Sequence, residues 1–261
     1  MDPRSLAEFR AAFEAGPPYD AQLLEELRLD GRAGAQSLYR RCLRCLRRVE
    51  RERERVEALM AFDDAVRAQG FDRVGGVDEA GRGPLAGPIV AGAVVLAGAV
   101  DRLNDSKQLK PEEREALFAV LREGRHDIGV GVVDAPQIDR IGIQRANYLA
   151  MAQAVAALKD EPDFLLVDGR HEIPGVRAPQ RPVVKGDSRS LSIAAASIVA
   201  KVTRDRMMAV LDREYPAYGF GTHKGYATSE HVAAIARCGP CLAHRKSFAP
   251  MARPMETGEL F

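Results

Sequence analysis

Residues 77–84, Val-Asp-Glu-Ala-Gly-Arg-Gly-Pro, restrict the possible folds of this chain more than any other stretch. Residues 71–77 begin as a strand, and residues 88–96 are apolar, rich in valine and typical of a second strand. Asp78 and Glu79 therefore stand where a buried strand meets a turn. Because successive strand side chains point to opposite faces, we expect the strand to end and the backbone to turn at Glu79 if the two carboxylates share one site.

The turn that follows contains Gly81 and Gly83, which leave main-chain groups uncovered and able to contact a sugar or a phosphate. A purely structural alternative is a strand end at which Arg82 forms an ion pair with a carboxylate. These residues alone favour neither interpretation.

The hydrophobic period changes at residue 71, and this change divides the chain into two predicted domains. Residues 1–70 are helical throughout and end in a long helix over about residues 35–69. Alternating charges at residues 50–55 interrupt its apolar stripe, and its acids and bases balance. We therefore expect an N-terminal helical extension over residues 1–70 with a packing or spacer role, and a second domain over residues 71–261 with a helical C-terminal part.

Residues 71–261 show the pattern of an α/β domain. Strands are predicted at residues 72–79, 88–96, 127–134, 163–168 and 181–185, and helices at residues 111–123, 143–158, 190–214 and 229–237. The first three strands favour an antiparallel meander, and the later strands alternate with helices as in crossover units. We predict a mixed sheet flanked by helices, with the small residues of 191–201 packing close to it.

Charge is distributed unevenly along the chain. The formal net charge is +1, but residues 181–253 carry 12 Lys and Arg against 5 Asp and Glu, a local charge of +7. A basic segment near clustered acids suits a polyanionic substrate, although a solvated basic face is an alternative. The mixed, charged start resembles no signal peptide, and the run at 86–100 is too broken to span a bilayer. We expect a cytoplasmic monomer without membrane contact.

The four cysteines form two Cys-x-x-Cys pairs that suggest a zinc site at first sight. Cys42 and Cys45 lie inside a helical pattern. Cys238 and Cys241 form Cys-Gly-Pro-Cys, the sequence of thioredoxin-like redox sites, but a helix at 229–237 precedes them where that chemistry needs a strand. We therefore expect structural thiols, and rank zinc binding above redox catalysis.

Two further carboxylates follow predicted strands. Asp168 ends the buried run Leu-Leu-Val-Asp-Gly, and Asp187 lies between a strand and the small-residue helix. Together with Asp78 and Glu79 they would repel one another unless divalent cations neutralise them, and oxygen ligands favour Mg²⁺ or Mn²⁺. Two such ions about 4 Å apart can support phosphodiester cleavage. The spacing alone therefore indicates a metal-dependent nuclease.

Several motifs together resemble the ribonuclease HII family. They are Gly-Val-Asp-Glu-Ala-Gly-Arg-Gly-Pro-Leu-Ala-Gly-Pro at 76–88, Asp-Ser-Lys-Gln-Leu at 105–109, Leu-Val-Asp-Gly at 166–169, Val-Lys-Gly-Asp at 184–187, Ala-Ala-Ser-Ile-Val-Ala-Lys-Val-Thr-Arg-Asp at 195–205, His-Lys-Gly-Tyr at 223–226 and His-Arg-Lys-Ser-Phe at 244–248. The resemblance covers about residues 71–250. It implies a ribonuclease H-like mixed five-stranded sheet, Mg²⁺ or Mn²⁺, and endonucleolytic cleavage of RNA in RNA–DNA hybrids. It also implies incision 5′ of single ribonucleotides in duplex DNA, leaving 3′-hydroxyl and 5′-phosphate ends.

The resemblance also implies roles for individual residues. The four acids match the catalytic carboxylates that hold two metal ions, with Asp78 between the ions. The turn of Gly81, Arg82 and Gly83 would read the 2′-hydroxyl, and Tyr226 would stack on the sugar at the deoxy side of the junction. Phosphate contacts are expected from Lys107, Lys201, Arg245, Lys246 and Ser247.

Two features depart from the resemblance, and two other functions remain as alternatives. Many family members lack the N-terminal extension, and the cysteine pair Cys238 and Cys241 stands where the family usually has no metal motif. The final residues, 256–261, are faintly similar to sliding-clamp-binding tails, although an untethered terminus is the preferred interpretation.

A junction-resolvase-type nuclease of the same fold would share the acids but not need Tyr226. A non-catalytic hybrid-binding module would not need all four acids.

Overall fold

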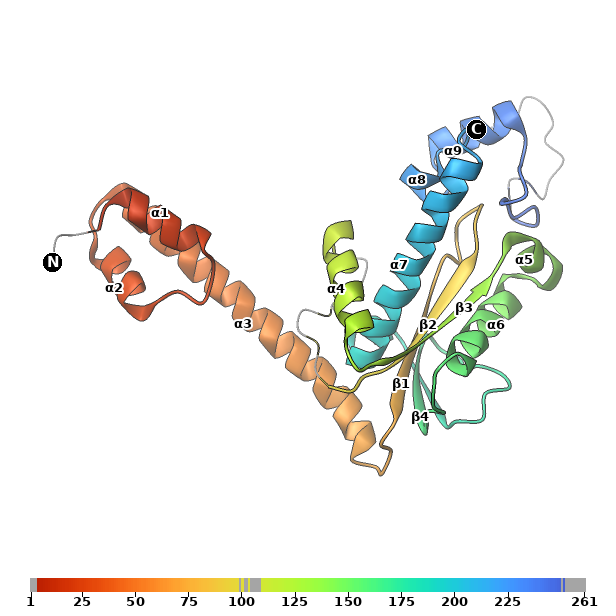
Figure 1. The fold of residues 1–261 in the computed structure, drawn as a ribbon, viewed down its shortest axis with the longest axis horizontal. Coiled ribbons are helices and arrows are strands. Elements are labelled where there is room, and N and C mark those ends of the chain that lie inside the picture. Colours follow the sequence, from red (N-terminus) through yellow and green to blue (C-terminus); the bar gives the residue numbers. More distant parts are fainter. Residues whose placement is uncertain (1–3, 99, 101–102, 104–108, 250, 252–261) are drawn as a thin grey trace. The chain divides into compact units, whose positions relative to one another are not determined.

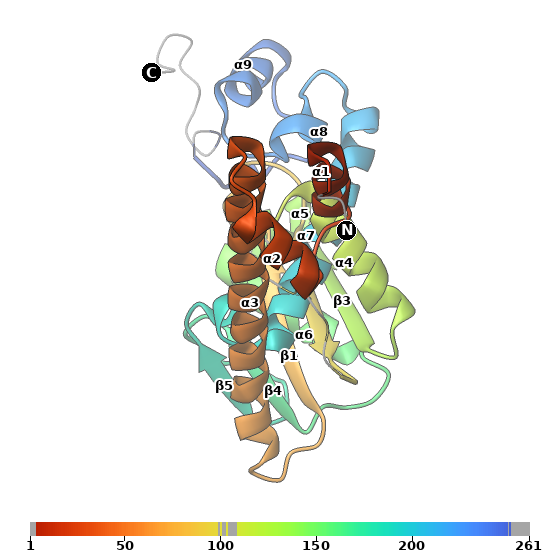
Figure 2. The same ribbon diagram turned by 90° about the vertical axis from the view of Figure 1, so that its left-hand side faces the viewer.

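The computed structural model describes residues 4–98, 100, 103, 109–249 and 251 (Figures 1 and 2). The chain divides into two compact units, Met1–Glu57 and Ala58–Phe261. In the part of the chain that is described, no helix is both long enough and apolar enough to cross a membrane.

The first unit contains α1 (Leu6–Glu14), α2 (Ala21–Leu29) and most of α3 (Ala33–Arg67). Side-chain caps begin the two short helices: Ser5 accepts from the Glu8 N–H in a capping box, and Asp20 accepts from the Gln22 N–H. A small core is shared among the three helices and consists of Phe9, Leu23, Leu27, Ala35, Leu38 and Cys42. Cys42 is thus part of a hydrophobic core.

The last turns of α3 belong to the second unit. The Ser192 N–H donates to Asp63 Oδ2 at 2.8 Å, and Val66 packs with Val74 and Leu166. The division between the units therefore falls at Glu57, earlier than the change of sequence period at residue 71.

The second unit is built on a five-stranded sheet in the order β3-β2-β1-β4-β5. Its strands are β1 (Val74–Ala80), β2 (Ile89–Val95), β3 (Asp127–Val133), β4 (Phe164–Asp168) and β5 (Gln180–Val183). The first three strands pair antiparallel, whereas β4 and β5 run parallel to β1, with β3 and β5 at the two edges (Figure 2). The predicted mixed sheet and its antiparallel meander are confirmed.

Helices cover both faces of this sheet (Figure 1). On one face α7 (Leu191–Glu214) packs on β1 and β2, with α4 (Pro111–Glu123) beside it. On the other face α6 (Ile143–Ala156) packs on β2 and β3, preceded by α5 (Ala135–Ile141). The short helix α8 (Phe220–His223) and α9 (Ser229–Cys238) follow α7.

The small residues of α7 allow it to approach the sheet closely. A Cβ atom built on Gly76 of β1 would fall on main-chain atoms of Ser192 and Ile193, and one on Gly92 of β2 would fall on the Ala196 carbonyl. The predicted close packing of this helix is confirmed, and it fixes α7 directly over the strand that carries Asp78.

Candidate active site

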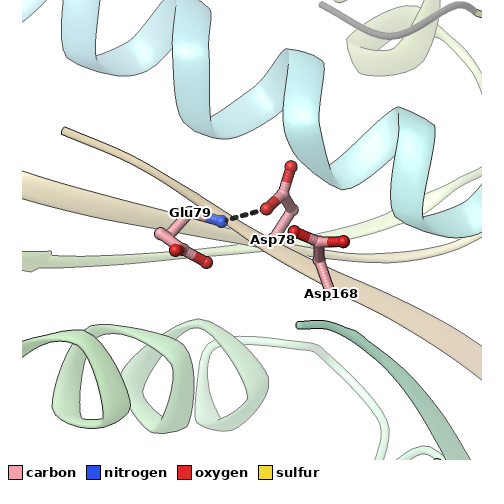
Figure 3. Close-up of side chains that lie close together, drawn as sticks. All are labelled: Asp78, Glu79 and Asp168. Atoms are coloured by element: carbon pink, nitrogen blue, oxygen red, sulfur yellow. Dashed lines mark hydrogen bonds between the residues drawn. The ribbon is translucent and has the colours of Figure 1, made fainter. Parts of the chain in front are cut away.

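Three carboxylates meet where β1 and β4 lie side by side. Asp78 and Glu79 come from β1, and Asp168 is the last residue of β4 (Figure 3). Each offers one oxygen, and these oxygens all lie within 4.8 Å of one another. The structure therefore brings together three of the four acids singled out in the sequence.

The local backbone differs from the expectation that β1 would end and turn at Glu79. Pairing with β2 continues to Ala80↔Val90, while pairing with β4 stops at Val77↔Val167. Asp78 and Glu79 consequently point to opposite sides of a continuous strand (Figure 3). The two carboxylates share a site because the pairing of β1 with β4 stops before Asp78, which leaves that edge of β1 unpaired. A turn of β1 is not involved.

Burial and mutual repulsion make this cluster electrostatically strained. Asp78 is only 5% exposed, and its burial, followed by the charges of Glu79 and Asp168, raises its pKa well above the ordinary value. The Glu79 N–H donates to Asp78 Oδ1 at 2.7 Å and partly opposes this rise in pKa. Burial also raises the pKa of Glu79, with Arg82 opposing the shift. A buried set of oxygen donors with excess negative charge fits a hard divalent cation such as Mg²⁺ or Mn²⁺.

Asp187 lies close to this cluster without joining the group of three. It sits on a short 3₁₀ turn (Gly186–Ser188), is buried, and its charge adds to the rise in the pKa of Asp78. The Gly186 N–H donates to Asp168 Oδ1 at 2.7 Å, which fixes the turn to the end of β4. The fourth acid therefore flanks the cluster.

The Gly81–Gly83 turn adjoins the acids directly. Arg82 Nη1 lies 3.3 Å from Glu79 Oε1, and Arg82 Nη2 donates to Gln144 Oε1 at 2.8 Å. The ion pair between Arg82 and a carboxylate, expected if the strand end were purely structural, is therefore present together with the acidic cluster. Tyr226 is 48% exposed, and its ring edge lies 3.9 Å from the position that a Cβ on Gly83 would occupy. The predicted ribose-reading turn and the predicted stacking ring thus lie side by side.

Arg245 has a different environment from the one expected of a phosphate contact. Its side chain is completely buried, and its N–H groups donate to the main-chain carbonyls of Gly81, Arg82 and Gly87. A guanidinium that is enclosed and hydrogen-bonded in this way cannot reach a phosphate outside. The structure corrects this expectation and gives Arg245 an internal position.

The other basic residues expected at phosphates differ in accessibility. Lys201 is partly buried, and its Nζ donates to Asp205 Oδ1 at 2.7 Å. Lys246 and Ser247 are exposed, and their main-chain N–H groups donate to the carboxylate of Asp139. Lys107 lies outside the described residues.

Both family models that match this chain describe one family. The model for ribonuclease HII matches residues 75–251, and the model for the ribonuclease HII N-terminal domain matches residues 5–67. The chain belongs to the ribonuclease HII family. It is therefore a ribonuclease H, an endonuclease that hydrolyses phosphodiester bonds.

Relatives and solved structures agree with this membership. Ribonuclease HII of Geobacillus thermodenitrificans (strain NG80-2) is 51% identical over 229 residues, which cover 87% of this chain and 88% of that protein. The ribonuclease H2 structure from Pyrococcus horikoshii OT3 matches with a TM-score of 0.58 and 28% identity, over 69% of this chain and 96% of that one. A PCNA:RNase HII complex from Archaeoglobus fulgidus contains a similar chain, with a TM-score of 0.56 and 26% identity over 70% and 98% of the two chains.

Sequence reasoning gave no role to Arg204, which lies within one of the ribonuclease HII motifs. Its side chain is buried on α7 and donates to the carbonyls of Ala86, Pro88 and Lys224. In the sequence Arg204 lies in the charged stretch Lys-Val-Thr-Arg-Asp-Arg at 201–206, which does not mark it as a buried residue. Its bonds hold the segment after the turn against the loop that carries Tyr226.

The second cysteine pair lies at the end of α9 in this ribonuclease HII fold. Cys238 is the last residue of α9, and burial raises the pKa of Cys241. All four cysteines are free, and in the described part of the chain the metal-binding group contains only carboxylates. The arrangement is the reverse of a redox site, in which the reactive cysteine begins a helix and its pKa is lowered.

Proposed function

We propose that this enzyme cleaves the RNA strand of RNA–DNA hybrids and incises 5′ of single ribonucleotides in duplex DNA, leaving 3′-hydroxyl and 5′-phosphate ends. One observation carries the proposal: the acidic cluster of Asp78, Glu79 and Asp168 adjoins the Gly81–Gly83 turn through Arg82, and Tyr226 lies beside that turn. Hydrolytic groups and groups able to recognise a ribose therefore share one surface.

The negative charge of this cluster favours the binding of divalent metal ions. We propose that Asp78, Glu79, Asp168 and Asp187 hold two Mg²⁺ or Mn²⁺ ions, with Asp78 between them. When bound, such ions would activate a water molecule and stabilise the leaving oxygen. The protein residues supply the oxygen ligands, and the packing of α7 over β1 keeps Asp78 shielded from bulk water.

Recognition of the ribose is assigned to the main chain of Gly81, Arg82 and Gly83. A 2′-hydroxyl can both donate and accept a hydrogen bond, so exposed peptide groups of the turn can bind it. Tyr226 would pack on the neighbouring sugar, where a 2′-hydroxyl would interfere. The two contacts together would select a step from RNA to DNA.

The remaining contacts are proposed from charge. Lys201, Lys246 and Ser247, within the basic segment 181–253 that carries +7, and Lys107, which precedes that segment, would bind backbone phosphates. The relation to a protein solved in complex with PCNA supports a weak sliding-clamp contact through residues 256–261, which lie outside the described residues. We propose that residues 1–70 form a separable extension of a cytoplasmic, monomeric enzyme.

Cleavage of a DNA duplex with one embedded ribonucleotide tests the proposal. The products are mapped to the nucleotide in Mg²⁺, in Mn²⁺ and with chelator, beside an all-DNA duplex and a four-way DNA junction. We expect metal-dependent incision on the 5′ side of the ribonucleotide and no cutting of DNA. Cutting of the junction would indicate the resolvase alternative, and binding without cutting would indicate a hybrid-binding module.

A further inference from the structure

A buried guanidinium underlies the Gly81–Gly83 turn. Arg245 is 0% exposed, and no ion-pair partner for it occurs among the described residues. Burial, and then the neighbouring charge of Arg204, lower the pKa of Arg245 to about 9, which leaves it protonated at neutral pH. A buried charge without a carboxylate partner is costly unless all its hydrogen bonds are made, so its position needs a reason.

Arg245 makes its hydrogen bonds to the backbone of one loop. Nη2 donates to the Gly81 carbonyl at 2.6 Å, Nη1 to the Arg82 carbonyl at 3.0 Å, and Nε to the Gly87 carbonyl at 3.0 Å. The planar fork of a guanidinium can serve three acceptors in fixed directions, which an ammonium group cannot do. Two consecutive carbonyls of the turn are therefore directed inward.

The planar trans peptide bond also fixes the direction of the N–H groups that follow these two carbonyls. In a planar trans peptide, the carbonyl of one residue and the N–H of the next point in opposite directions. With the carbonyls of Gly81 and Arg82 directed to Arg245, the N–H groups of Arg82 and Gly83 point away from the protein interior. Both residues are exposed. Two successive outward N–H groups form a concave site for a negative or lone-pair-bearing oxygen.

These two N–H groups differ from their neighbours on the same loop. The Leu85 N–H donates to the Gly225 carbonyl and the Gly87 N–H to the Ala243 carbonyl, each at 2.8 Å. For Arg82 and Gly83, the part of the chain that the structure describes offers no acceptor. The outward donors are therefore restricted to the turn beside the acidic cluster.

The guanidinium of Arg204 packs directly against the same turn, at Gly81. Gly81 has φ +97°, and a Cβ atom there would fall on Nε of Arg204. Arg204 in turn donates to the carbonyls of Ala86, Pro88 and Lys224. The turn thus rests on Arg204 while Arg245 sets the direction of its peptide groups.

We propose that Arg245 is a positioning residue for ribose recognition, because its buried guanidinium directs the N–H groups of Arg82 and Gly83 toward the 2′-oxygen of the substrate. The inference rests on the proposed function, in which this turn reads the ribose. It assigns the specificity to two main-chain donors, and it assigns their direction to a side chain that never touches the nucleic acid.

Binding to two duplexes that differ by one oxygen tests this role. The full chain and its Arg245→Lys variant are titrated, in chelator to prevent cleavage, with a DNA duplex containing one ribonucleotide and with the matching all-DNA duplex. We expect the preference for the ribonucleotide to fall about tenfold in the variant, equivalent to about 1.4 kcal/mol, while affinity for all-DNA duplex stays within about twofold. Arg237→Lys, at an exposed arginine of the same basic segment, is the control and should keep the preference.

The outcomes separate this inference from the function on which it rests. An unchanged preference in Arg245→Lys, or an equal loss of affinity for both duplexes, overturns the positioning role alone. If the unaltered chain binds the ribonucleotide duplex and the all-DNA duplex equally and cuts both, the proposed ribose recognition is wrong. The positioning role of Arg245 is then wrong as well.

Amide hydrogen exchange on the unaltered chain gives a second test that does not depend on the folding of a variant. The Arg82 and Gly83 amides should exchange fast in the free protein. They should slow at least about tenfold with the ribonucleotide duplex but not with all-DNA duplex. Leu85 and Gly87 serve as internal controls and should exchange slowly throughout. Slow exchange of Arg82 and Gly83 in the free protein, or equal protection by both duplexes, would overturn the proposal.

Discussion

Asp78 is the residue at which burial and charge oppose each other most strongly. Its raised pKa means that the native state binds a proton there more tightly than the unfolded chain, whose aspartate has a pKa of about 3.9. The stability contributed by this group is therefore complete below about pH 4 and is lost as the pH rises through the native pKa. At neutral pH and without metal, the buried carboxyl of Asp78 therefore lowers the stability of the fold.

Asp78→Asn should therefore separate activity from stability. We expect it to abolish cleavage in Mg²⁺ and to raise the melting temperature of the metal-free protein at pH 7, because asparagine resembles the protonated carboxyl. The gain in melting temperature should vanish below about pH 4, where the wild-type residue is also neutral. Kinetics in Mg²⁺ and thermal melts from about pH 3 to about pH 8 in chelator measure both effects. Near-normal turnover by the variant would show that the site is misassigned.

Tyr226 provides a test of junction reading. Tyr226→Ala should lower single-ribonucleotide incision by about tenfold, in the range of one lost stacking contact, and should lower cleavage of a long hybrid less. Tyr226→Phe keeps the ring and is the matched control, so it should behave like the wild type. The measurement is kcat/KM on both substrates. An equal loss on both in Tyr226→Ala would limit the residue to general binding or packing.

Among the elements, those with a strong local signal were predicted from sequence. The strands, the meander and the close packing of α7 followed from apolar periodicity and small residues. Helix α5 was missed, although Asp134 followed by Pro136 is a typical helix start. The open edge of β1 could not be predicted, because it depends on where β4 ends in a different part of the chain. The interior position of Arg245 likewise depends on distant segments meeting.

The contact between β1 and α7 should tolerate no added side-chain atom. Gly76→Ala would place a Cβ on main-chain atoms of Ser192 and Ile193, which cannot move aside as a flexible side chain could. We expect a loss of about 1–3 kcal/mol in the free energy of unfolding, measured by denaturant titration. Gly31→Ala is the control, because nothing lies within 4 Å of its Cβ position. An unchanged stability of Gly76→Ala would contradict the close approach of α7.

For the molecule as a whole, the two units meet within one continuous helix, and the site of truncation matters. Asp63 accepts a hydrogen bond from the first turn of α7, and Val66 is fully buried beside β1 and β4. Both residues lie in the sequence-defined extension of residues 1–70 but pack with the catalytic unit. The predicted boundary at residue 70 and the structural division at Glu57 therefore lead to different fragments.

Both fragments should keep metal-dependent cleavage, because all four acids lie beyond residue 70. The 71–261 fragment should be less stable than 58–261 by about 2–4 kcal/mol, since it loses the Asp63 cap and the burial of Val66. Denaturant titration compares their stabilities, and cleavage of a hybrid in Mg²⁺ compares their activities. A folded 58–261 fragment that cuts no hybrid would count against a separable extension.

Arg204 and Arg245 attach to main-chain oxygens, and every amino acid carries such an oxygen. The support beneath the turn therefore does not depend on which side chain occupies position 82, whose own groups point to Glu79 and Gln144. The conformation of the loop therefore depends on Arg204 and Arg245, whereas the charge beside Glu79 depends on the side chain at position 82. Substitutions at position 82 would therefore change the charge beside Glu79 while the main-chain donors of the turn keep their support.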